Sequence, residues 1–261
     1  MDVVFSPSTI ALVFLVISVA GFVTGVTGFG FAVVGTGLLA SILPSQTAIL
    51  LMLFPMLAAT LSLVNELERQ HFSECVNRFW MFFVTILTGT VIGMLVLDSI
   101  PTQPLTLALG AFVLVYVAFI QSVLPVPGRA MLTSAVASPG RVEEGAIGFV
   151  SGLIFGATNI GVQVVTYVKT LNLDHSTFVG VLAMIFAGLT AIRIGLAAWL
   201  GLYVDIPLII VSLSAVLPSL LSVRLGQIIR PQISERQTNL GIVVLLTIIG
   251  IRLVTESLGL L

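Results

Sequence analysis

Charged residues are scarce in this chain. Its 261 residues include 10 Lys and Arg and 11 Asp and Glu, together 8% of the sequence, whereas soluble domains contain about 25%. So few charges could not cover the surface of a water-soluble protein of this length. With 58% hydrophobic residues and a mean hydropathy of +1.21, the chain is predicted to be an all-α integral membrane protein in contact with a lipid bilayer.

Other scarcities exclude further classes of protein. The net charge is −1, so the chain offers no basic field for nucleic acid. Cys75 is the only cysteine, which excludes an internal disulfide. The two histidines, His71 and His175, stand at the edges of apolar segments and form no Cys/His cluster with metal spacing. We therefore expect no metal, no cofactor and no enzymatic centre.

Eight apolar segments are separated by polar gaps. The gap at 125–144, with three prolines and two glycines, is predicted to be a cytoplasmic linker between an N-terminal repeat (1–124) and a C-terminal repeat (145–261). The segments are 9–43, 45–65, 78–98 and 103–124 in the first half, and 145–170, 175–199, 205–223 and 238–258 in the second.

The two halves contain similar phrases. GFVTG at 21–25 matches GFVSG at 148–152, 127 positions later, and GFAVV at 30–34 matches GVQVV at 161–165, 131 positions later. The difference in offset predicts an insertion in the second copy. Two matches in the same order indicate an internal duplication. The phrases GFVTG and GFVSG themselves are best interpreted as small-residue strips for close helix packing, since such strips are common in membrane helices.

Basic residues predict the orientation of the repeats. If 9–43 and 145–170 are hairpins that enter and leave on one side, eight basic residues fall on the cytoplasmic side, as the positive-inside rule requires. Each half then crosses the membrane three times, so the second repeat is inverted. These eight are Arg69, Arg78, Arg129, Arg141, Lys169, Arg224, Arg230 and Arg236.

Both hairpin segments are rich in residues that break helices. Segment 9–43 is 35 residues long and has glycines at 25, 28, 30, 35 and 37, which make a poor continuous helix. Segment 145–170 is interrupted around Asn159 and Gly161. We expect a break in each, flanked by two half-helices of about 12–15 residues, which are long enough to pass the bilayer midplane.

The candidate binding site lies at these breaks. Hydroxyl, amide and free backbone N–H groups gather there, and the half-helix after each break points its positive end at the gap, which suits a small anion. A competing interpretation is that Asn159 and Gln163 only cap carbonyls freed by the break. The candidates are Thr24, Thr27, Gly28 and Gly30 in the first copy, and Ser151, Thr158, Asn159, Gly161 and Gln163 in the second.

Arg193 is the only full charge well inside an apolar segment. Because a buried arginine is unfavourable in lipid, it should face the protein interior or a cavity, where it could pair with a substrate anion. Arg193 also lies six residues before Trp199, so it could instead extend to the outer interface. The sequence leaves both roles open.

These motifs resemble a known family. The glycine-rich opening GFVTGVTGFGFAVVGTGLL, the mid-chain GFVSGLIFGATNIGVQVV and the polar central linker are similar to the TauE/SafE transporters, which export sulfite and organosulfonates. The resemblance implies a secondary transporter, working as an exporter of small sulfur-containing anions in the inner (plasma) membrane, by alternating access around a site between two broken helices. An anion channel, or a transporter of another small anion, remains the alternative.

Overall fold

The structure is a bundle of α-helices. The computed structural model describes residues 6–64, 80–97, 99–120, 141–169, 171, 173, 175–203, 206–233 and 235–259. Within these ranges the chain forms α-helices and one short 3-10 helix, with no strand, which confirms the all-α prediction. The helices of the first half are α1 (Pro7–Thr27), α2 (Phe31–Ala40), α3 (Ser45–Leu51), α4 (Leu53–Val64), α6 (Trp80–Leu97) and α7 (Thr102–Ile120), and those of the second are α9 (Arg141–Thr158), α10 (Val162–Lys169), α11 (His175–Trp199), α12 (Ile206–Ser214), α13 (Val216–Ile229) and α14 (Glu235–Ser257).

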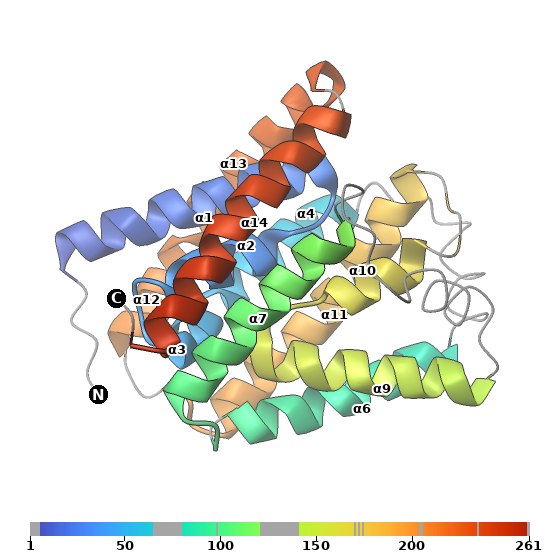
Figure 1. The fold of residues 1–261 in the computed structure, drawn as a ribbon, viewed down its shortest axis with the longest axis horizontal. Helices are drawn as coiled ribbons and strands as arrows, with labels where there is room; N and C mark the ends of the chain where they lie inside the picture. The colour runs from blue at the N-terminus through green and yellow to red at the C-terminus, as the bar shows by residue number, and fades with distance from the viewer. Residues whose placement is uncertain are drawn as a thin grey trace.

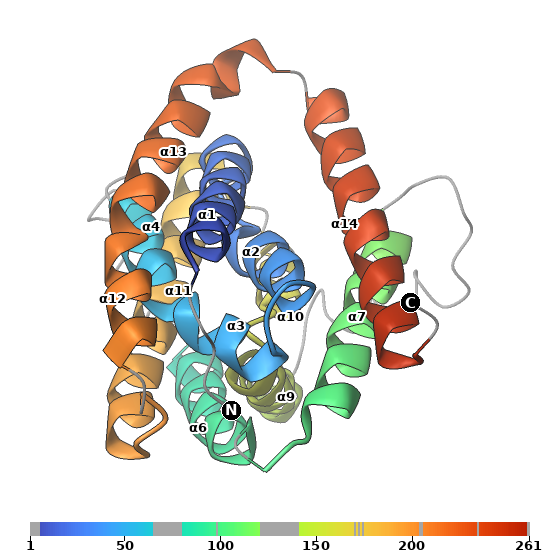
Figure 2. The same ribbon diagram turned by 90° about the vertical axis from the view of Figure 1, so that its left-hand side faces the viewer.

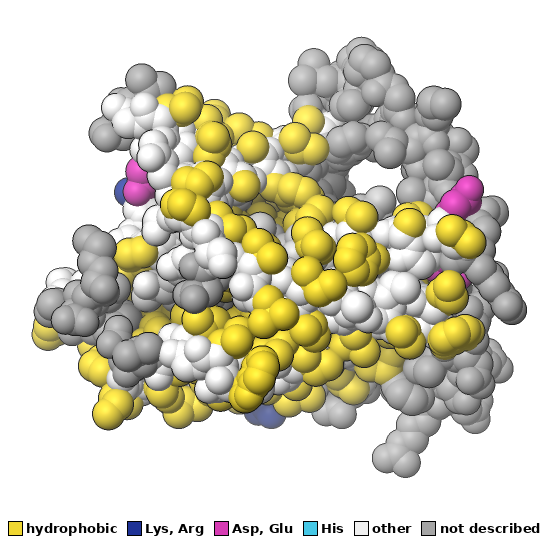
Figure 3. Space-filling view, turned by 90° about the horizontal axis from the view of Figure 1, so that it is seen from below, with side chains coloured by type: hydrophobic (Ala, Val, Ile, Leu, Met, Phe, Trp, Pro, Cys, Tyr) yellow, Lys and Arg dark blue, Asp and Glu magenta, His cyan; other side chains and the backbone are white. Residues whose placement is uncertain are grey.

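The surface and the helix lengths fit a lipid environment. Five of the described helices or helix pairs are long and apolar enough to cross a membrane. Hydrophobic side chains are spread across the described part of the face in Figure 3, with few charged ones. Leu15, Val84 and Leu217 are examples that are more than half exposed. Exposed apolar surface of this extent marks contact with lipid or another apolar partner.

The helix ends gather at opposite sides of the bundle. In Figure 1, α1 begins and α14 ends on the left, where α6 also ends and α7 begins, whereas α6 and α9 begin on the right. Figure 2 shows α1 and α2 at the centre, between α13 and α14. Of the eight basic residues that predict the orientation, Arg69, Arg78 and Arg129 lie outside the described residues, as does the linker from 125 to 140.

Each predicted hairpin segment is broken where expected, but its two arms are unequal. The first is interrupted at residues 28–30 and the second at 159–161. The arms have 21 and 10 residues in α1 and α2, and 18 and 8 in α9 and α10. The expectation of half-helices of about 12–15 residues is therefore wrong: α1 is about 31 Å long at 1.5 Å per residue, enough to span the hydrocarbon core, and only the second arm is short.

Two other predicted spans are interrupted. Segment 45–65 forms α3 and α4, and 205–223 forms α12 and α13, which continues to Ile229. Pro55 in α4 has no N–H to donate to the carbonyl of Leu51. The Ser212 hydroxyl of α12 donates to that carbonyl at 2.6 Å, and Ser219 of α13 donates to the carbonyl of Pro55 at 2.9 Å. Serines of the second half thus satisfy the irregular backbone of the first, as burial in a membrane requires.

The glycine strips pack helices of one half against helices of the other. Gly21 and Gly25 of α1 lie against α13, and Gly152 and Gly156 of α9 lie against α6. A Cβ atom on any of these four would come closer than 3.0 Å to atoms of the facing helix. A Cβ on Gly148, the first glycine of GFVSG, would also come within 3.0 Å of α6. The packing interpretation of GFVTG and GFVSG is confirmed, because only glycine lets these backbones approach so closely.

The surroundings of the glycines correct the predicted offset. A Cβ on Gly25 or on Gly156 would meet the same three kinds of atom within about 3.0 Å: a carbonyl oxygen, a glycine Cα and a backbone nitrogen. These belong to Val223, Gly226 and Gln227 around Gly25, and to Thr90, Gly93 and Met94 around Gly156. Gly25 and Gly156 are 131 positions apart, the offset that also relates the two breaks, so the predicted insertion is wrong. By these surroundings, GFVTG matches GLIFG at 152–156, one helical turn after GFVSG.

Close packing predicts a large effect from a single methyl group. In Gly152→Ala the new Cβ would meet the backbone of Ile86, so α6 and α9 would have to separate. We expect a loss of about 1–3 kcal/mol in stability, seen as a lower thermal unfolding temperature in detergent. The control is Gly195→Ala, whose Cβ meets no atom within 4 Å and which should be neutral or slightly stabilising. Equal effects of the two substitutions would contradict this packing.

Candidate functional site

At the first break, a threonine hydroxyl forms hydrogen bonds with the backbone and two glycines adopt positive φ angles. The Thr27 hydroxyl donates to the carbonyl of Val23 at 2.9 Å and accepts the N–H of Phe29 at 3.2 Å. Gly28 ends α1 with φ of 81° and Gly30 precedes α2 with φ of 102°. Both conformations are left-handed and favour glycine. The chain therefore reverses within three residues and starts α2 in a new direction.

The second break repeats this arrangement 131 positions later. The Thr158 hydroxyl donates to the carbonyl of Ile154 at 2.6 Å and accepts the N–H of Ile160 at 3.2 Å. Asn159 takes the place of Gly28, with φ of 67°, and is the only non-glycine residue with positive φ in the described part of the chain. Asparagine tolerates this conformation better than most residues. Asn159 also places a side chain at the second break, whereas Gly28 at the first break has none.

Asn159 connects the two halves of the protein. It is fully buried; its Nδ2 donates to the Thr36 hydroxyl of α2 at 3.0 Å, and its Oδ1 accepts a hydrogen bond from Nη1 of Arg193 in α11. The interpretation that Asn159 only caps carbonyls freed by the break is therefore wrong. Gln163 does not cap them either, because both polar atoms of its amide are buried and have no partner among the described residues.

Arg193 does not extend to the membrane surface. Its exposed fraction is 0%, and its guanidinium carbon lies 5.1 Å from the centre of the Phe155 ring. The interfacial role predicted as one alternative is wrong. Beyond the bond to Asn159, Nε and Nη2 are buried and have no hydrogen-bond partner within the described ranges. Burying a cation with two unpaired donor nitrogens is unfavourable in free energy, so the position of Arg193 indicates a function.

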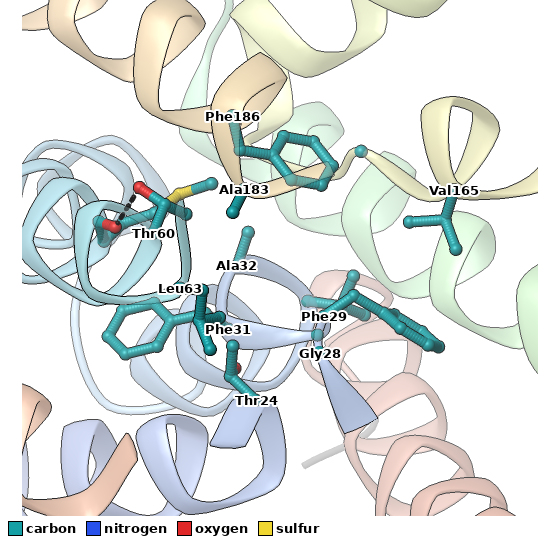
Figure 4. Close-up of a pocket in the computed structure, with 14 residues that line it drawn as sticks. Thr24, Gly28, Phe29, Phe31, Ala32, Thr60, Leu63, Val165, Ala183 and Phe186 are labelled. Carbon is teal, nitrogen blue, oxygen red and sulfur yellow. Dashed lines mark hydrogen bonds between the residues drawn. The ribbon is translucent and has the colours of Figure 1, made fainter. Parts of the chain in front are cut away.

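A small cavity lies between the two breaks. Of the predicted residues it brings together Thr24, Gly28, Gly30 and Gly161, while Thr27, Ser151, Thr158, Asn159, Gln163 and Arg193 do not line it. Figure 4 shows Thr60 and Leu63 of α4, and Ala183 and Phe186 of α11, around the first break. The complete lining is Thr24, Gly28, Phe29, Gly30, Phe31, Ala32, Val33, Met56, Thr60, Leu63, Gly161, Val165, Ala183 and Phe186.

The polar groups of the cavity come mainly from the backbone. The hydroxyls of Thr24 and Thr60 donate to carbonyls of their own helices, at 2.7 and 2.8 Å, so only their lone pairs remain. Gly30 provides no side-chain cap for α2. The N–H groups at the first turn of α2, in Phe31 to Val33, have no partner within the helix. These N–H groups form the positive end of the helix dipole. Most of the side chains around them in the cavity lining are apolar.

Several residues of this region were not among the predicted ones. Phe155 and Phe186 are buried beside the second break with ring centroids 5.4 Å apart, and Thr36 holds Asn159. Nothing distinguishes these phenylalanines in the sequence from the chain's other aromatic residues. Thr36 lies inside an apolar run, where a lone hydroxyl is a signal that could have singled it out.

Comparison with known proteins identifies the family. The family described as Sulfite exporter TauE/SafE matches residues 13–253. The chain belongs to the TauE/SafE family. No curated protein and no solved structure matches the chain. As a TauE/SafE member with five described helices able to span a membrane, it is a multi-pass membrane protein of a transporter family, as the sequence motifs indicated.

The backbone of this TauE/SafE protein at Asn159 can be tested by two substitutions. Asn159→Gly and Asn159→Ala both lose the bonds to Thr36 and Arg193, but only alanine resists a left-handed conformation, by about 1–2 kcal/mol. We expect Asn159→Ala to unfold at a lower temperature than Asn159→Gly, and both below the parent. If the two variants are equally stable, Asn159 is not held at positive φ.

Proposed function

We propose that the protein is a secondary transporter that exports small sulfur-containing anions, such as sulfite or organosulfonates. The anion would bind between the two broken helices and be released by alternating access. The observation that carries this proposal is a cavity that both breaks line, through Gly28 and Gly30 on one side and Gly161 on the other. Family membership supports the anion class.

Alternating access is easiest to understand if the two halves are an inverted duplication. The packing supports this: α1 of the first half packs on α13 of the second, and α9 of the second packs on α6 of the first. In the same way α4 packs on α11 and α7 on α14. If α1 is exchanged with α9, α6 with α13, α4 with α11 and α7 with α14, the same set of contacts results, as a two-fold relation requires. The matching threonines, Thr27 and Thr158, support the same relation.

Two sources of positive potential favour an anion at this place. One is the uncapped first turn of α2, whose residues Phe31 to Val33 line the cavity; a helix end contributes from a few tenths to about 2 kcal/mol toward an anion. The other is Arg193, buried behind the second break. No carboxylate pairs with Arg193 in the described part of the protein. A transported anion would supply the missing negative charge.

The size of the cavity favours a transporter over a channel. The cavity holds about 30 Å³, roughly the space of two water molecules. An anion with three oxygens and a sulfur needs more space, so helices must move before it can enter. A conducting channel would instead need a continuous wet path. Movement of the two halves about their shared contacts would open the site to one side at a time.

The direct test is transport into and out of proteoliposomes. Purified protein should move sulfite or a small organosulfonate down its gradient without ATP, with saturable kinetics and competition among related anions. Sulfate and acetate belong in the same panel as comparison anions. If the protein transports none of these anions, or passes them at a rate that never saturates, the proposed transport function is wrong.

A matched pair of variants tests the position of the site. Ala183 lines the cavity and is 2% exposed, so Ala183→Leu should fill it and reduce transport per folded protein on the order of 10-fold, equivalent to about 1.4 kcal/mol. Ala198→Leu is the control, because Ala198 lies on the exposed side of the same helix. Transport by Ala183→Leu with the parent rate and apparent affinity would place the site elsewhere.

A further inference from the structure

One face of α11 carries buried polar atoms that nothing in the described structure satisfies. Thr190 and Arg193 are both 0% exposed. The Thr190 hydroxyl has no hydrogen-bond partner among the described residues, and the same holds for Nε and Nη2 of Arg193. Unsatisfied buried polar groups are rare in native proteins, and each one needs an explanation such as a missing water or ion.

Thr190 is unusual among the helical threonines of this protein. A buried threonine in a helix normally donates its hydroxyl to the carbonyl one turn earlier. Thr24, Thr60 and Thr90 do this at 2.7, 2.8 and 2.7 Å. The Thr190 hydroxyl makes no such bond, so it is free to donate to another group.

The two residues lie on the same side of α11, next to the second break. Phe186, Thr190 and Arg193 are spaced four and three residues apart, which places them along one face of a helix. Both ends of this row are fixed: Phe186 packs near Gly161 and against Phe155, and Arg193 bonds to Asn159. Thr190 lies between them and therefore faces the same break.

The unbonded edge of the Arg193 guanidinium, formed by Nε and Nη2, has a geometry that favours oxyanions. Nη1 is engaged by Asn159, which leaves Nε and Nη2, the two nitrogens that point parallel N–H groups in one direction. This edge of a guanidinium forms two parallel hydrogen bonds with two oxygens of one oxyanion. Thr190, one turn away on the same face, offers a third donor.

We infer that Thr190 and Arg193 form the subsite that holds the three-oxygen head of the anion. Two oxygens of a sulfite or sulfonate group would accept from Nε and Nη2 of Arg193, and the third from the Thr190 hydroxyl. The bound anion is then the counter-ion of the buried guanidinium. Neither residue lines the cavity, so the helix movement that admits the anion must also open the cavity to this face of α11. This inference rests on the transport function proposed above and specifies where the charge is then bound.

The counterpart region of the first half cannot do the same. Met56 of α4 and Phe186 of α11 both line the cavity. They are 130 positions apart, one fewer than the two breaks, and this offset pairs Thr60 with Thr190 and Leu63 with Arg193. The Thr60 hydroxyl already donates to the carbonyls of Met56 and Leu57, and Leu63 is apolar. The charged head therefore has one position, in the second half, although both halves form the cavity.

Calorimetry on the full chain in detergent tests the subsite with two conservative variants. Thr190→Val should weaken binding of sulfite and methanesulfonate by on the order of 10-fold, because one hydrogen bond to a charged group is lost. Binding of acetate, which has only two oxygens, should change by less than about twofold. Thr90→Val is the matched control, because Thr90 is also 0% exposed but does not line the cavity, and it should leave the affinity for all three anions within about twofold of the parent. Arg193→Lys should weaken binding of all three, because lysine lacks the two-point fork.

The outcomes separate this inference from the proposed function. If the parent binds sulfite or methanesulfonate but Thr190→Val binds them as tightly as the parent, the subsite is wrong while transport stands. The subsite is also wrong if Thr90→Val weakens binding as much as Thr190→Val does. If the parent binds none of the three anions, the proposed function fails together with the inference.

Discussion

The hydrogen bond from Arg193 to Asn159 is the interaction on which the rest of the site depends. It holds the side chain of a residue in a left-handed conformation at the second break, and through Asn159 it reaches Thr36 in the other half. It also fixes the guanidinium so that Nε and Nη2 remain free. One neutral partner cannot offset a full buried charge, because the cost of removing an ion from water is several kcal/mol. Within the described part of the protein, no carboxylate offsets the charge of Arg193.

Close packing at glycines holds the two broken helices in place around this site. The strips Gly21/Gly25 and Gly152/Gly156 let each broken helix lie directly against a helix of the other half. Without that close approach the two breaks could not line one cavity. Ser212 has a similar supporting role at the interruption around Pro55, because its hydroxyl donates to the carbonyl that Pro55 leaves without a donor. Small residues therefore set the distances between helices, and scarce polar side chains satisfy the backbone where those helices bend.

The sequence was sufficient to predict the fold class and the positions of both breaks, because apolar length and glycine content act locally. It was also sufficient to choose Gly28, Gly30 and Gly161 as neighbours of one cavity. The lengths of the arms were not predictable in this way, since α1 continues through Gly21 and Gly25, which would weaken an isolated helix but are stabilised here by packing on α13. The offset of 127 was misleading for a related reason: two glycine strips one turn apart look alike in sequence, and only their partners distinguish them. Arg193 was ambiguous because the direction of a long side chain depends on its neighbours in space.

The central claim is that a bound anion neutralises Arg193, and Asn159→Asp tests it most directly. Aspartate tolerates the left-handed backbone, and its carboxylate would accept from Arg193 in place of the amide oxygen, which makes it a permanent internal counter-ion. Affinity for sulfite, measured by calorimetry on the purified variant, should then fall at least about 10-fold, equivalent to about 1.4 kcal/mol, while the empty protein becomes no less stable to heat. Parent-like sulfite affinity in a folded Asn159→Asp protein would show that the anion does not neutralise Arg193, and would contradict this account.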